Sequence, residues 1–398
     1  MMRSDQRTLR WAVMVGLLGV IGLLAVACGG DDPTPTPRPT PTSPPADTTP
    51  AWEIEWNQLL EDARAEGQVV VRMGGSASRN FAPRFEVFEN ETGIKVIAET
   101  GRGSQQVEKV KAEREAGIFS SDVWMTGVTS SNNVRKLGAL VDDVVDHIVL
   151  PDVADTSNWL DGHHWLADTG TRNTIFAFCA SPSTQFAYNT DLVDASELDS
   201  YWDLIDGRFA GQIVGTIPWE AGQTNSDFYI NTPALGEDYI RKVILDSDVL
   251  WVADGQQGVD LLAFGEKSIM MYQGNSNDDI DDLEGEGLPV RNHFGQGFAE
   301  GGVISLGGAC AMSLFDTPAN PAAQTVFFNW WMGADNLFEA QGLTNDQSLR
   351  VDVPSNNFEQ TYARAPGIDY FFPEMDDSIE ANIGLAFNRM LADDNGLR

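Results

Sequence analysis

The chain has 398 residues, and its 59 acidic and 25 basic residues give it a formal net charge of −34 at pH 7. Because binding to a phosphate backbone requires a basic face, this balance excludes nucleic acid as a partner. The chain is longer than a single hydrophobic core usually supports, so we expect two lobes.

Residues 1–27 have the pattern of a secretory signal peptide. Three arginines in the first ten residues precede an uncharged, mostly apolar run that ends in the letters AVAC. This pattern predicts cleavage before Cys28 and lipidation of Cys28. The alternative is an uncleaved membrane anchor, although the run is somewhat shorter than a spanning helix needs. In both cases we expect an extracytoplasmic protein on the outer face of the cytoplasmic membrane, in the periplasm or at the cell surface.

Residues 28–50 alternate proline and threonine with almost nothing apolar. A segment of this composition cannot bury enough surface to fold and tends to stay extended. We therefore predict a disordered linker between the membrane and the folded part of the chain.

The folded part begins with helices that alternate with short apolar strands. Apolar residues at helical spacing indicate the helices, and the first two end at Gly67 and Gly93. The third is expected to be capped by Ser104. The predicted strands are 69–71, 94–98 and 122–125. This order predicts a parallel sheet covered by helices on both faces.

Three polar loops lie where the predicted strands end. In parallel sheets, ligands bind beyond the carboxyl ends of the strands. The loops are Gly74–Ser78, Gly101–Ser104 and Thr126–Asn132, and each leads into a helix. A helix N-terminus presents unpaired N–H groups and partial positive charge, so these loops favour a carboxylate, phosphate or sulfonate. The alternative is that their serines only cap helices, and the two roles are compatible.

A second alternation of strands and helices begins near residue 190. The predicted strands are 212–217 and 268–272, and the predicted helices are 236–245, 256–264, 322–332 and 335–340. A last helix carries Ile379, Ile383, Phe387 and Met390 on one face. The whole folded part is therefore predicted to be of the α/β class.

Sequence signatures of catalysis are missing from the chain. It contains no phosphate-binding Walker loop, no dinucleotide fingerprint and no nucleophile elbow. His163 and His164 are adjacent, so on an extended segment they would point to opposite faces and would not share a metal. The acidic run 275–287 lacks the spacing of a calcium loop and is interpreted as a solvated helix. We predict a protein that is not an enzyme and has no cofactor and no metal site.

Several motifs in a fixed order resemble one family of proteins. They are ETGIKV (91–96), SSDVWM (120–125), AYNTDLV (187–193), YWDLIDGRFAGQIV (201–214) and ANPAAQTVFFNWWMGADNLFEAQG (319–342). Together they resemble an extracellular solute-binding protein of an ABC transporter. The resemblance is to the type 2 periplasmic binding fold, in the branch of iron(III), spermidine/putrescine, thiamine and phosphonate binders.

This resemblance implies two α/β lobes joined by crossing hinge strands, with the ligand in the cleft between them. Lobe 1 is expected to comprise residues 51–188 and 296–345, and lobe 2 residues 189–295. Residues 346–398 are expected to form a C-terminal helical segment that packs on the lobes. The resemblance also implies that the lobes close on a solute as a monomer, and that the solute passes to a permease and its ATPase.

Two cysteines remain once Cys28 is assigned to lipid. Cys179 and Cys310 are an even pair in an oxidising compartment, which makes a disulfide plausible, and two buried free thiols are the alternative. The resemblance places both cysteines in strands near the hinge, and it therefore favours the disulfide.

The predicted ligand contacts are backbone N–H groups and hydroxyls of the three loops, with aromatic and amide side chains closing from the second lobe. They are Ser76, Ala77, Ser78, Arg102, Gly103, Ser104, Trp124, Thr126, Ser130, Tyr188, Trp219, Tyr272 and Asn275.

The predicted solute is small and anionic or bears an acid group. The alternatives are two other solutes, iron(III) and a polyamine, and two other classes of function. Iron-binding relatives use neighbouring tyrosines, whereas no two of the seven tyrosines here are adjacent in sequence. A polyamine binder would use acidic and aromatic residues such as Asp122 and Trp124. A protein of another class would be a ligand-sensing module for a membrane signalling partner. An extracellular hydrolase would need a carboxylate pair in a cleft, and the sequence identifies none.

Overall fold

The computed structural model describes residues 49–166, 173–220, 224–273, 276–306, 309–368, 370–373 and 383–398. The predicted signal peptide, Cys28, almost all of the predicted linker and Asn275 lie outside these residues. No helix among the described residues is long and apolar enough to cross a membrane.

The first lobe is built on a six-stranded sheet with the order β2-β1-β3-β13-β5-β4. The central strand β1 (Gln68–Gly74) is parallel to β2 (Lys95–Gly101) and to β3 (Val123–Met125). The antiparallel strands on the other side are β13 (Ala311–Leu314), β5 (Phe176–Ala177) and β4 (Trp165–Leu166). The predicted alternation of strands and helices is therefore present, and the structure adds an antiparallel half to the sheet.

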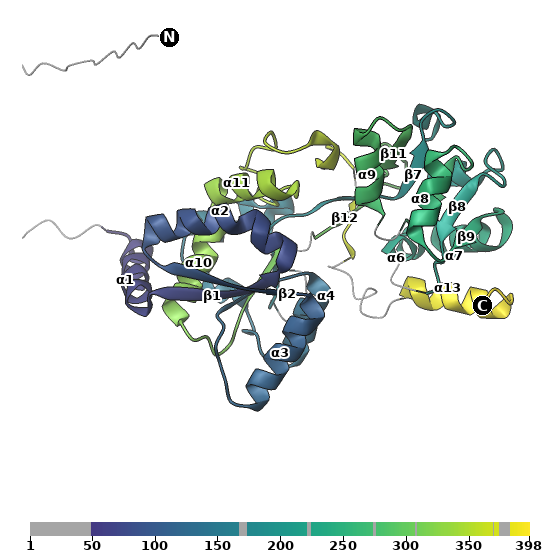
Figure 1. Cartoon of the computed structure of the whole chain (residues 1–398). Helices are drawn as coiled ribbons and strands as arrows, with labels where there is room; N and C mark the ends of the chain where they lie inside the picture. Colours follow the sequence, from purple (N-terminus) through teal and green to yellow (C-terminus); the bar gives the residue numbers. More distant parts are fainter. Residues whose placement is uncertain are drawn as a thin grey trace, which may run out of the picture. The chain divides into compact units, whose positions relative to one another are not determined.

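Helices cover this sheet and bury its apolar residues (Figure 1). They are α1 (Ala51–Glu66), α2 (Gly75–Thr92), α3 (Gly103–Glu115), α4 (Val128–Lys136), α10 (Pro321–Trp331) and α11 (Ala334–Thr344). An aromatic cluster joins α2 to α10: the ring of Phe81 meets that of Trp331 at 5.0 Å, and Phe88 meets Trp330 at 5.1 Å. Short helical turns follow α4, at Val144–His147, Pro151–Ala154, Thr156–Asn158 and Leu160–Gly162.

The second lobe is built on a five-stranded sheet with the order β11-β7-β10-β8-β9. Its parallel strands are β8 (Ile213–Thr216), β9 (Leu250–Val252) and β10 (Ile269–Met271). The strand β7 (Phe186–Asn189) pairs antiparallel with β10 and with β11 (Val290–His293). The predicted lobe boundary at residue 188 would cut through β7. The structure differs because both hydrogen-bonding edges of β7 are used by strands of this second sheet.

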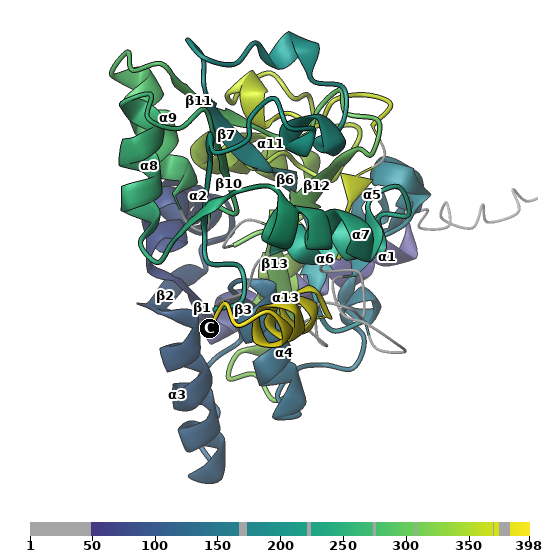
Figure 2. The ribbon, with the colours of Figure 1, turned by 90° about the vertical axis from the view of Figure 1, so that its right-hand side faces the viewer.

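Helices of the second lobe surround this sheet, and α8 (Gly255–Ala263) and α9 (Asn277–Gly285) lie side by side (Figures 1 and 2). The others are α6 (Thr224–Asn231), α7 (Gly236–Arg241), the π-helical turn Lys242–Asp246, and 3-10 turns at Ala195–Glu197 and Tyr201–Ile205. The run YWDLI therefore forms a 3-10 helix, and a capping box of Ser200 and Asp203 starts it.

A third, three-stranded sheet has the order β14-β12-β6. The strand β12 (Gly302–Ser305) pairs antiparallel with β6 (Ser181–Ser183) and parallel with β14 (Tyr370–Phe371). Cys179 and Cys310 are joined by a disulfide beside this sheet, with their Cα atoms 4.9 Å apart. The bond links residues 131 positions apart along the chain.

The C-terminal segment is less helical than its sequence pattern indicates. Between residues 346 and 373 the structure has loops, a 3-10 turn at Gln360–Tyr362 and the strand β14. The helix α13 (Ile383–Asp394) follows, and it packs against α6 in the second lobe. Tyr370 and Phe371 pair with β12, and isolated bridges join Ser348 to Cys179 and Arg350 to Trp159, which periodicity within the segment cannot reveal.

The contact between α13 and α6 depends on a glycine. A Cβ atom at Gly384 would lie 2.6 Å from the backbone nitrogen of Asp227. The Gly384 N–H donates to Asp227 Oδ1 at 2.9 Å, and Asn388 Nδ2 donates to the Pro218 carbonyl at 2.9 Å. The helix thereby holds both α6 and the chain that leaves β8.

The substitution Gly384→Ala should destabilise the protein, because the new methyl group meets backbone atoms that cannot rotate away. Overpacking of this kind costs about 1–3 kcal/mol. The matched control is Gly285→Ala in α9, where a Cβ would meet nothing within 4 Å. Urea unfolding should show a lower midpoint for Gly384→Ala only, and equal midpoints for both variants would contradict the packing described.

Replacing both Cys179 and Cys310 by alanine should lower the free energy of unfolding by about 2–5 kcal/mol, because a crosslink over a long loop restricts the unfolded chain. The free energy of unfolding of the double variant, measured without reductant, should equal that of the wild type measured with its disulfide reduced. A double variant as stable as the oxidised wild type would show that the crosslink contributes nothing.

Candidate functional site

Three strand–helix junctions lie at the carboxyl edge of β1, β2 and β3. The residues that precede α2, α3 and α4 are Gly74, Arg102 and Gly127, and none of them makes a side-chain capping hydrogen bond. The first N–H groups of an α-helix have no partner within the helix. These three helix starts therefore offer donors and partial positive charge to an anion.

The prediction that Ser104 caps α3 is wrong. The strand β2 continues through Gly101, Arg102 is extended with φ −66° and ψ 140°, and the helix begins at Gly103. Ser104 is thus the second residue of α3, and its side chain is exposed. The helix α2 likewise begins earlier than predicted, at Gly75, because the Gly-Ser-Ala-Ser stretch that was interpreted as a turn forms its first helical turn.

The starts of α3 and α4 lie in close contact. A Cβ atom built on Gly103 would lie 2.2 Å from Ser130 Oγ and 3.1 Å from Ser130 Cβ. Glycine at position 103 therefore lets the hydroxyl of Ser130, which is half-buried, lie against the first turn of α3. The structure brings these two predicted residues together.

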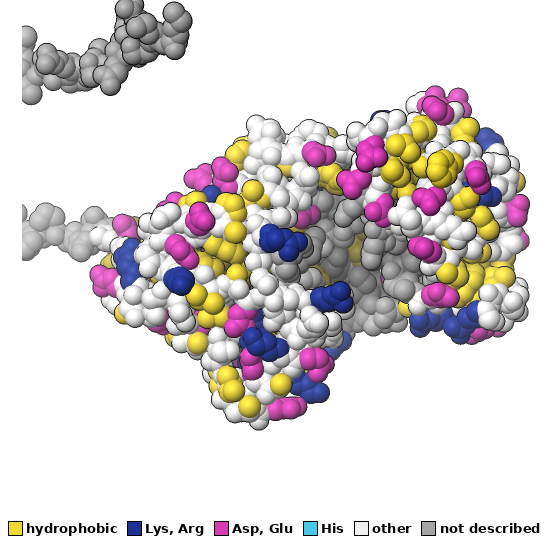
Figure 3. Space-filling model, in the orientation of Figure 1, with side chains coloured by type: hydrophobic (Ala, Val, Ile, Leu, Met, Phe, Trp, Pro, Cys, Tyr) yellow, Lys and Arg dark blue, Asp and Glu magenta, His cyan; other side chains and the backbone are white. Residues whose placement is uncertain are grey.

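The other predicted polar residues of this lobe differ in their exposure. Ser78 is half-buried in α2, and Arg102 is exposed, as is Arg79. Backbone atoms of Ser76 and Ala77 belong to the first turn of α2, and their side chains lie outside the described part of the structure. Lys and Arg side chains appear on the face of this lobe that carries α2 and α3 (Figure 3).

Trp124 and Thr126 are buried at the end of β3. Trp124 has no exposed surface, its indole N–H donates to Ser131 Oγ at 3.0 Å, and its ring packs on Phe315 at 6.3 Å. Thr126 is 2% exposed. Because both side chains are buried, we leave them out of the proposed site.

The predicted aromatic residues of the second lobe are also buried. Trp219 packs against Trp251 with ring centroids 5.8 Å apart, and Tyr188 is 7% exposed in β7. Tyr272 has no exposed surface, and its hydroxyl accepts a hydrogen bond from Ser226 at 3.2 Å. Its backbone has φ 51°, an uncommon conformation for a residue other than glycine. The turn that follows β10 is therefore strained at Tyr272, while the ring itself packs into the core.

Four tyrosines that are far apart in sequence gather in the core of the second lobe. The ring of Tyr229 lies 4.8 Å from Tyr239, 5.6 Å from Tyr201 and 6.0 Å from Tyr272. Burial raises the pKa of all four phenols above the ordinary value. The phenolate form, which a ferric ion would need, is therefore disfavoured in this cluster.

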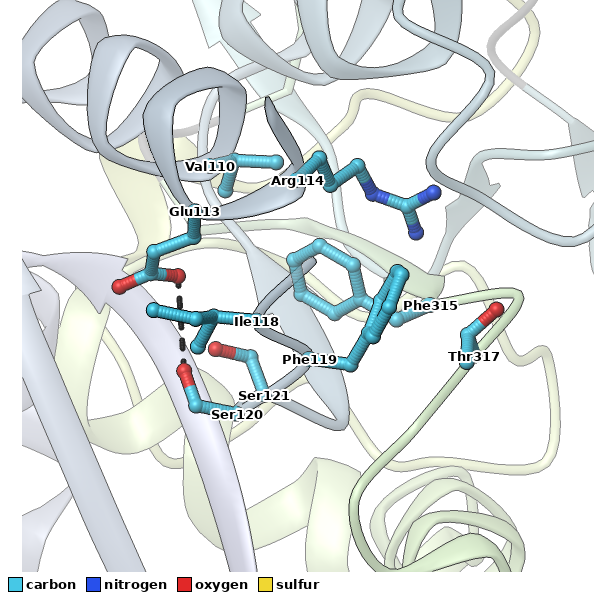
Figure 4. Close-up of a pocket in the computed structure, with 9 residues that line it drawn as sticks. All are labelled: Val110, Glu113, Arg114, Ile118, Phe119, Ser120, Ser121, Phe315 and Thr317. Carbon is cyan, nitrogen blue, oxygen red and sulfur yellow. Dashed lines mark hydrogen bonds between the residues drawn. The ribbon is translucent and has the colours of Figure 1, made fainter. Parts of the chain in front are cut away.

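A hollow in the first lobe lies at the C-terminal end of α3 (Figure 4). Glu113 and Arg114 at the C-terminal end of α3 line it, with the exposed side chains of Ile118 and Phe119. Arg114 is already paired with Asp316, and Ser120 bonds to Glu113. None of the predicted ligand residues lines this hollow, so we do not assign it to the site.

Comparison with solved structures identifies the fold. Iron- and citrate-bound IdiA (FutA) of Trichodesmium is 16% identical with a TM-score of 0.59, and the match covers 83% of this chain and 100% of that one. Ferric iron-binding protein A of Mannheimia haemolytica, in an open conformation, is 13% identical with a TM-score of 0.60, over 82% and 98%. An ABC transporter protein of Clostridium perfringens is 14% identical with a TM-score of 0.59, over 81% and 99%.

These likenesses show that the chain has the two-lobed α/β fold of periplasmic solute-binding proteins. No protein-family model matches the sequence, and no curated protein matches it either. Since a shared fold does not specify a ligand, the assignment of function depends on the residues of the site.

The pH dependence of stability should depend on His293 in β11. Its ring stacks on Phe186 at 4.6 Å and its Nδ1 accepts a hydrogen bond from the Gly295 N–H, while burial lowers its pKa to about 4. Because the folded protein binds a proton at His293 less readily than the unfolded chain does, protonation favours unfolding. The stability that the neutral ring contributes is therefore present above pH 6.5 and is lost as the pH falls through 4. The loss over this range should reach up to about 3 kcal/mol.

The measurement is the difference in unfolding free energy between wild type and His293→Asn from pH 7 to pH 4. The difference is needed because burial raises the pKa of Asp346 to about 6, which acts with the opposite sign. Wild type should lose more stability than His293→Asn on acidification, and His163→Gln, at an exposed histidine, should behave as wild type. Parallel curves for wild type and His293→Asn would contradict the assignment.

Proposed function

We propose that the protein is an extracytoplasmic solute-binding receptor of an ABC importer that captures a small anionic solute. The observation that carries this proposal is the set of three helix starts without side-chain caps at one edge of the first lobe's sheet. The two-lobed fold supports it, because in this fold two lobes can close on a solute.

The chemistry of the helix starts favours an anion with two or more acceptor oxygens. Each helix start contributes N–H donors, the hydroxyl of Ser130 lies against Gly103, and the exposed guanidinium of Arg102 is next to the same turn. Carboxylates, phosphates and sulfonates accept several such bonds at once, and charged acceptors form stronger bonds than neutral ones. The overall charge of −34 does not oppose this, because net charge does not describe a local site.

Delivery of the solute follows from the rest of the proposal. Lipid on Cys28 and the proline-rich linker of residues 28–50 would tether the folded part to the outer face of the membrane. The closed receptor, acting as a monomer, would pass its solute to a permease with its ATPase. Neither a cofactor nor a resident metal has a role in this scheme.

Iron(III) is the second candidate solute, because two of the similar structures are described as iron-bound or ferric iron-binding. In this chain, however, five of the seven tyrosines are buried in the core of the second lobe. We therefore place the anion first. A visible phenolate-to-iron absorption band on addition of ferric nitrilotriacetate would reverse that order. A polyamine is not favoured, because Asp122 and Trp124 have no exposed surface.

The proposed anion site should be sensitive to a single methyl group. In Gly103→Ala the new Cβ would displace the Ser130 hydroxyl, which should weaken solute binding by at least about tenfold, or about 1.4 kcal/mol. The matched control is Gly285→Ala in α9, outside the proposed site, where a Cβ meets nothing within 4 Å. The solute would be found by thermal shift against a library of small acids, and affinities measured by tryptophan fluorescence.

Two results would contradict the proposal. One is a library in which no anion raises the melting temperature while a cation or a neutral solute does. The other is an anion that binds wild type, Gly103→Ala and Gly285→Ala with the same affinity, since it would then bind elsewhere.

A further inference from the structure

A cavity of about 550 Å³ lies beside the three-stranded sheet, and none of the residues that line it belongs to the three helix starts. Ile304 of β12 and Tyr370 of β14 line it, together with Asp161 and Val351 from two separate loops. Two arginines, Arg350 and Arg364, also face it. No motif or periodicity in the sequence marks the residues that line this cavity, so the sequence predicts no ligand role for them.

The charge of Arg350 is fully matched by carboxylates. Its Nε and Nη2 donate to the two oxygens of Asp352 at 2.9 and 2.7 Å, and its Nη1 lies 3.2 Å from Asp152 Oδ2. A bidentate pair of this geometry is among the stronger side-chain contacts. Arg350 therefore has a structural role and is not available to a ligand.

Arg364 is bound differently. Its Nη1 donates to the carbonyl oxygens of Ala180 at 2.5 Å and of Gln347 at 3.1 Å, and its Nη2 donates to that of Ser348 at 2.5 Å. Among the described residues, no carboxylate forms an ion pair with it, and Asp161 acts on its charge only from a longer distance, which raises its pKa. Desolvation lowers its pKa to about 10, so the guanidinium is still charged at neutral pH. Neutral carbonyls do not neutralise a desolvated cation, which normally requires a counter-ion.

The free donors of Arg364 have the geometry of an anion receptor. A guanidinium has five N–H groups, and the three bonds to carbonyls leave one on Nη2 and the one on Nε. These two groups form a planar fork that matches the two oxygens of a carboxylate.

We propose that this cavity is a second binding site, for a small organic carboxylate that pairs with Arg364. The apolar side chains of Ile304 and Val351 suit a carbon skeleton rather than a bare inorganic anion. Asp161, an exposed acid at the same cavity, would attract an ammonium group, so an α-amino acid satisfies both charges. This site is independent of the anion site at the helix starts.

The test is isothermal titration of the folded chain with propionate, L-alanine and inorganic phosphate at constant ionic strength. Val351 is 59% exposed, so Val351→Glu and Val351→Gln should both fold. The added carboxylate of Val351→Glu should weaken binding of propionate and L-alanine at least tenfold. Val351→Gln introduces a side chain of the same shape as glutamate but without the charge, and it should bind both ligands as wild type does. Gly103→Ala should leave this binding unchanged, which separates the two sites.

Arg364→Lys keeps the charge and removes the fork, so it should also lose most of the affinity while remaining folded. If this variant does not fold, the Val351 pair decides. The proposal is overturned if no organic carboxylate binds saturably below concentrations on the order of 10 mM. It is also overturned if Val351→Glu and Val351→Gln bind equally, or if phosphate binds as well as propionate and L-alanine.

Discussion

The parallel pairing of β1 with β2 and with β3 determines where this protein can bind a ligand. Each of these strands runs directly into a helix, so the pairing places the starts of α2, α3 and α4 at one edge of the sheet. Polar residues at the opposite edge hold the strands in register. The buried carboxylate of Asp122 accepts hydrogen bonds from Val70 N–H at 2.7 Å and from Asn320 N–H at 2.7 Å. The pairing therefore rests on buried polar contacts as well as on apolar burial.

The two lobes contribute differently to the proposed site. The first lobe offers backbone donors at helix starts without side-chain caps, and Gly103 lets the starts of α3 and α4 lie in close contact at Ser130. In the second lobe, the side chains of Trp219 and Tyr272 belong to the core. What the second lobe supplies is the support of α13, whose Asn388 and Arg389 bond to the carbonyls of Pro218 and Trp219. The loop after β8 is thus held from behind by the C-terminal helix.

The sequence predicts those features that depend on local periodicity. It indicates the strands and helices of the first lobe, because apolar residues recur there with a regular period. It fails where distant segments decide the outcome: β7 joins the second sheet through β10 and β11, and β14 pairs with β12 across the chain. It also fails for Trp124 and Tyr272, because the same aromatic residue suits a cleft or a core. The absence of a cap at Arg102 depends on where β2 ends, which composition does not reveal.

Hydrogen exchange of backbone amides tests the central claim most directly. The protein would be compared with and without the solute that co-purifies with it, after that solute is identified by native mass spectrometry. Exchange should slow at the first turns of α2, α3 and α4, because the solute accepts hydrogen bonds from their N–H groups. Unchanged exchange at all three helix starts, with slowing elsewhere, would contradict the account.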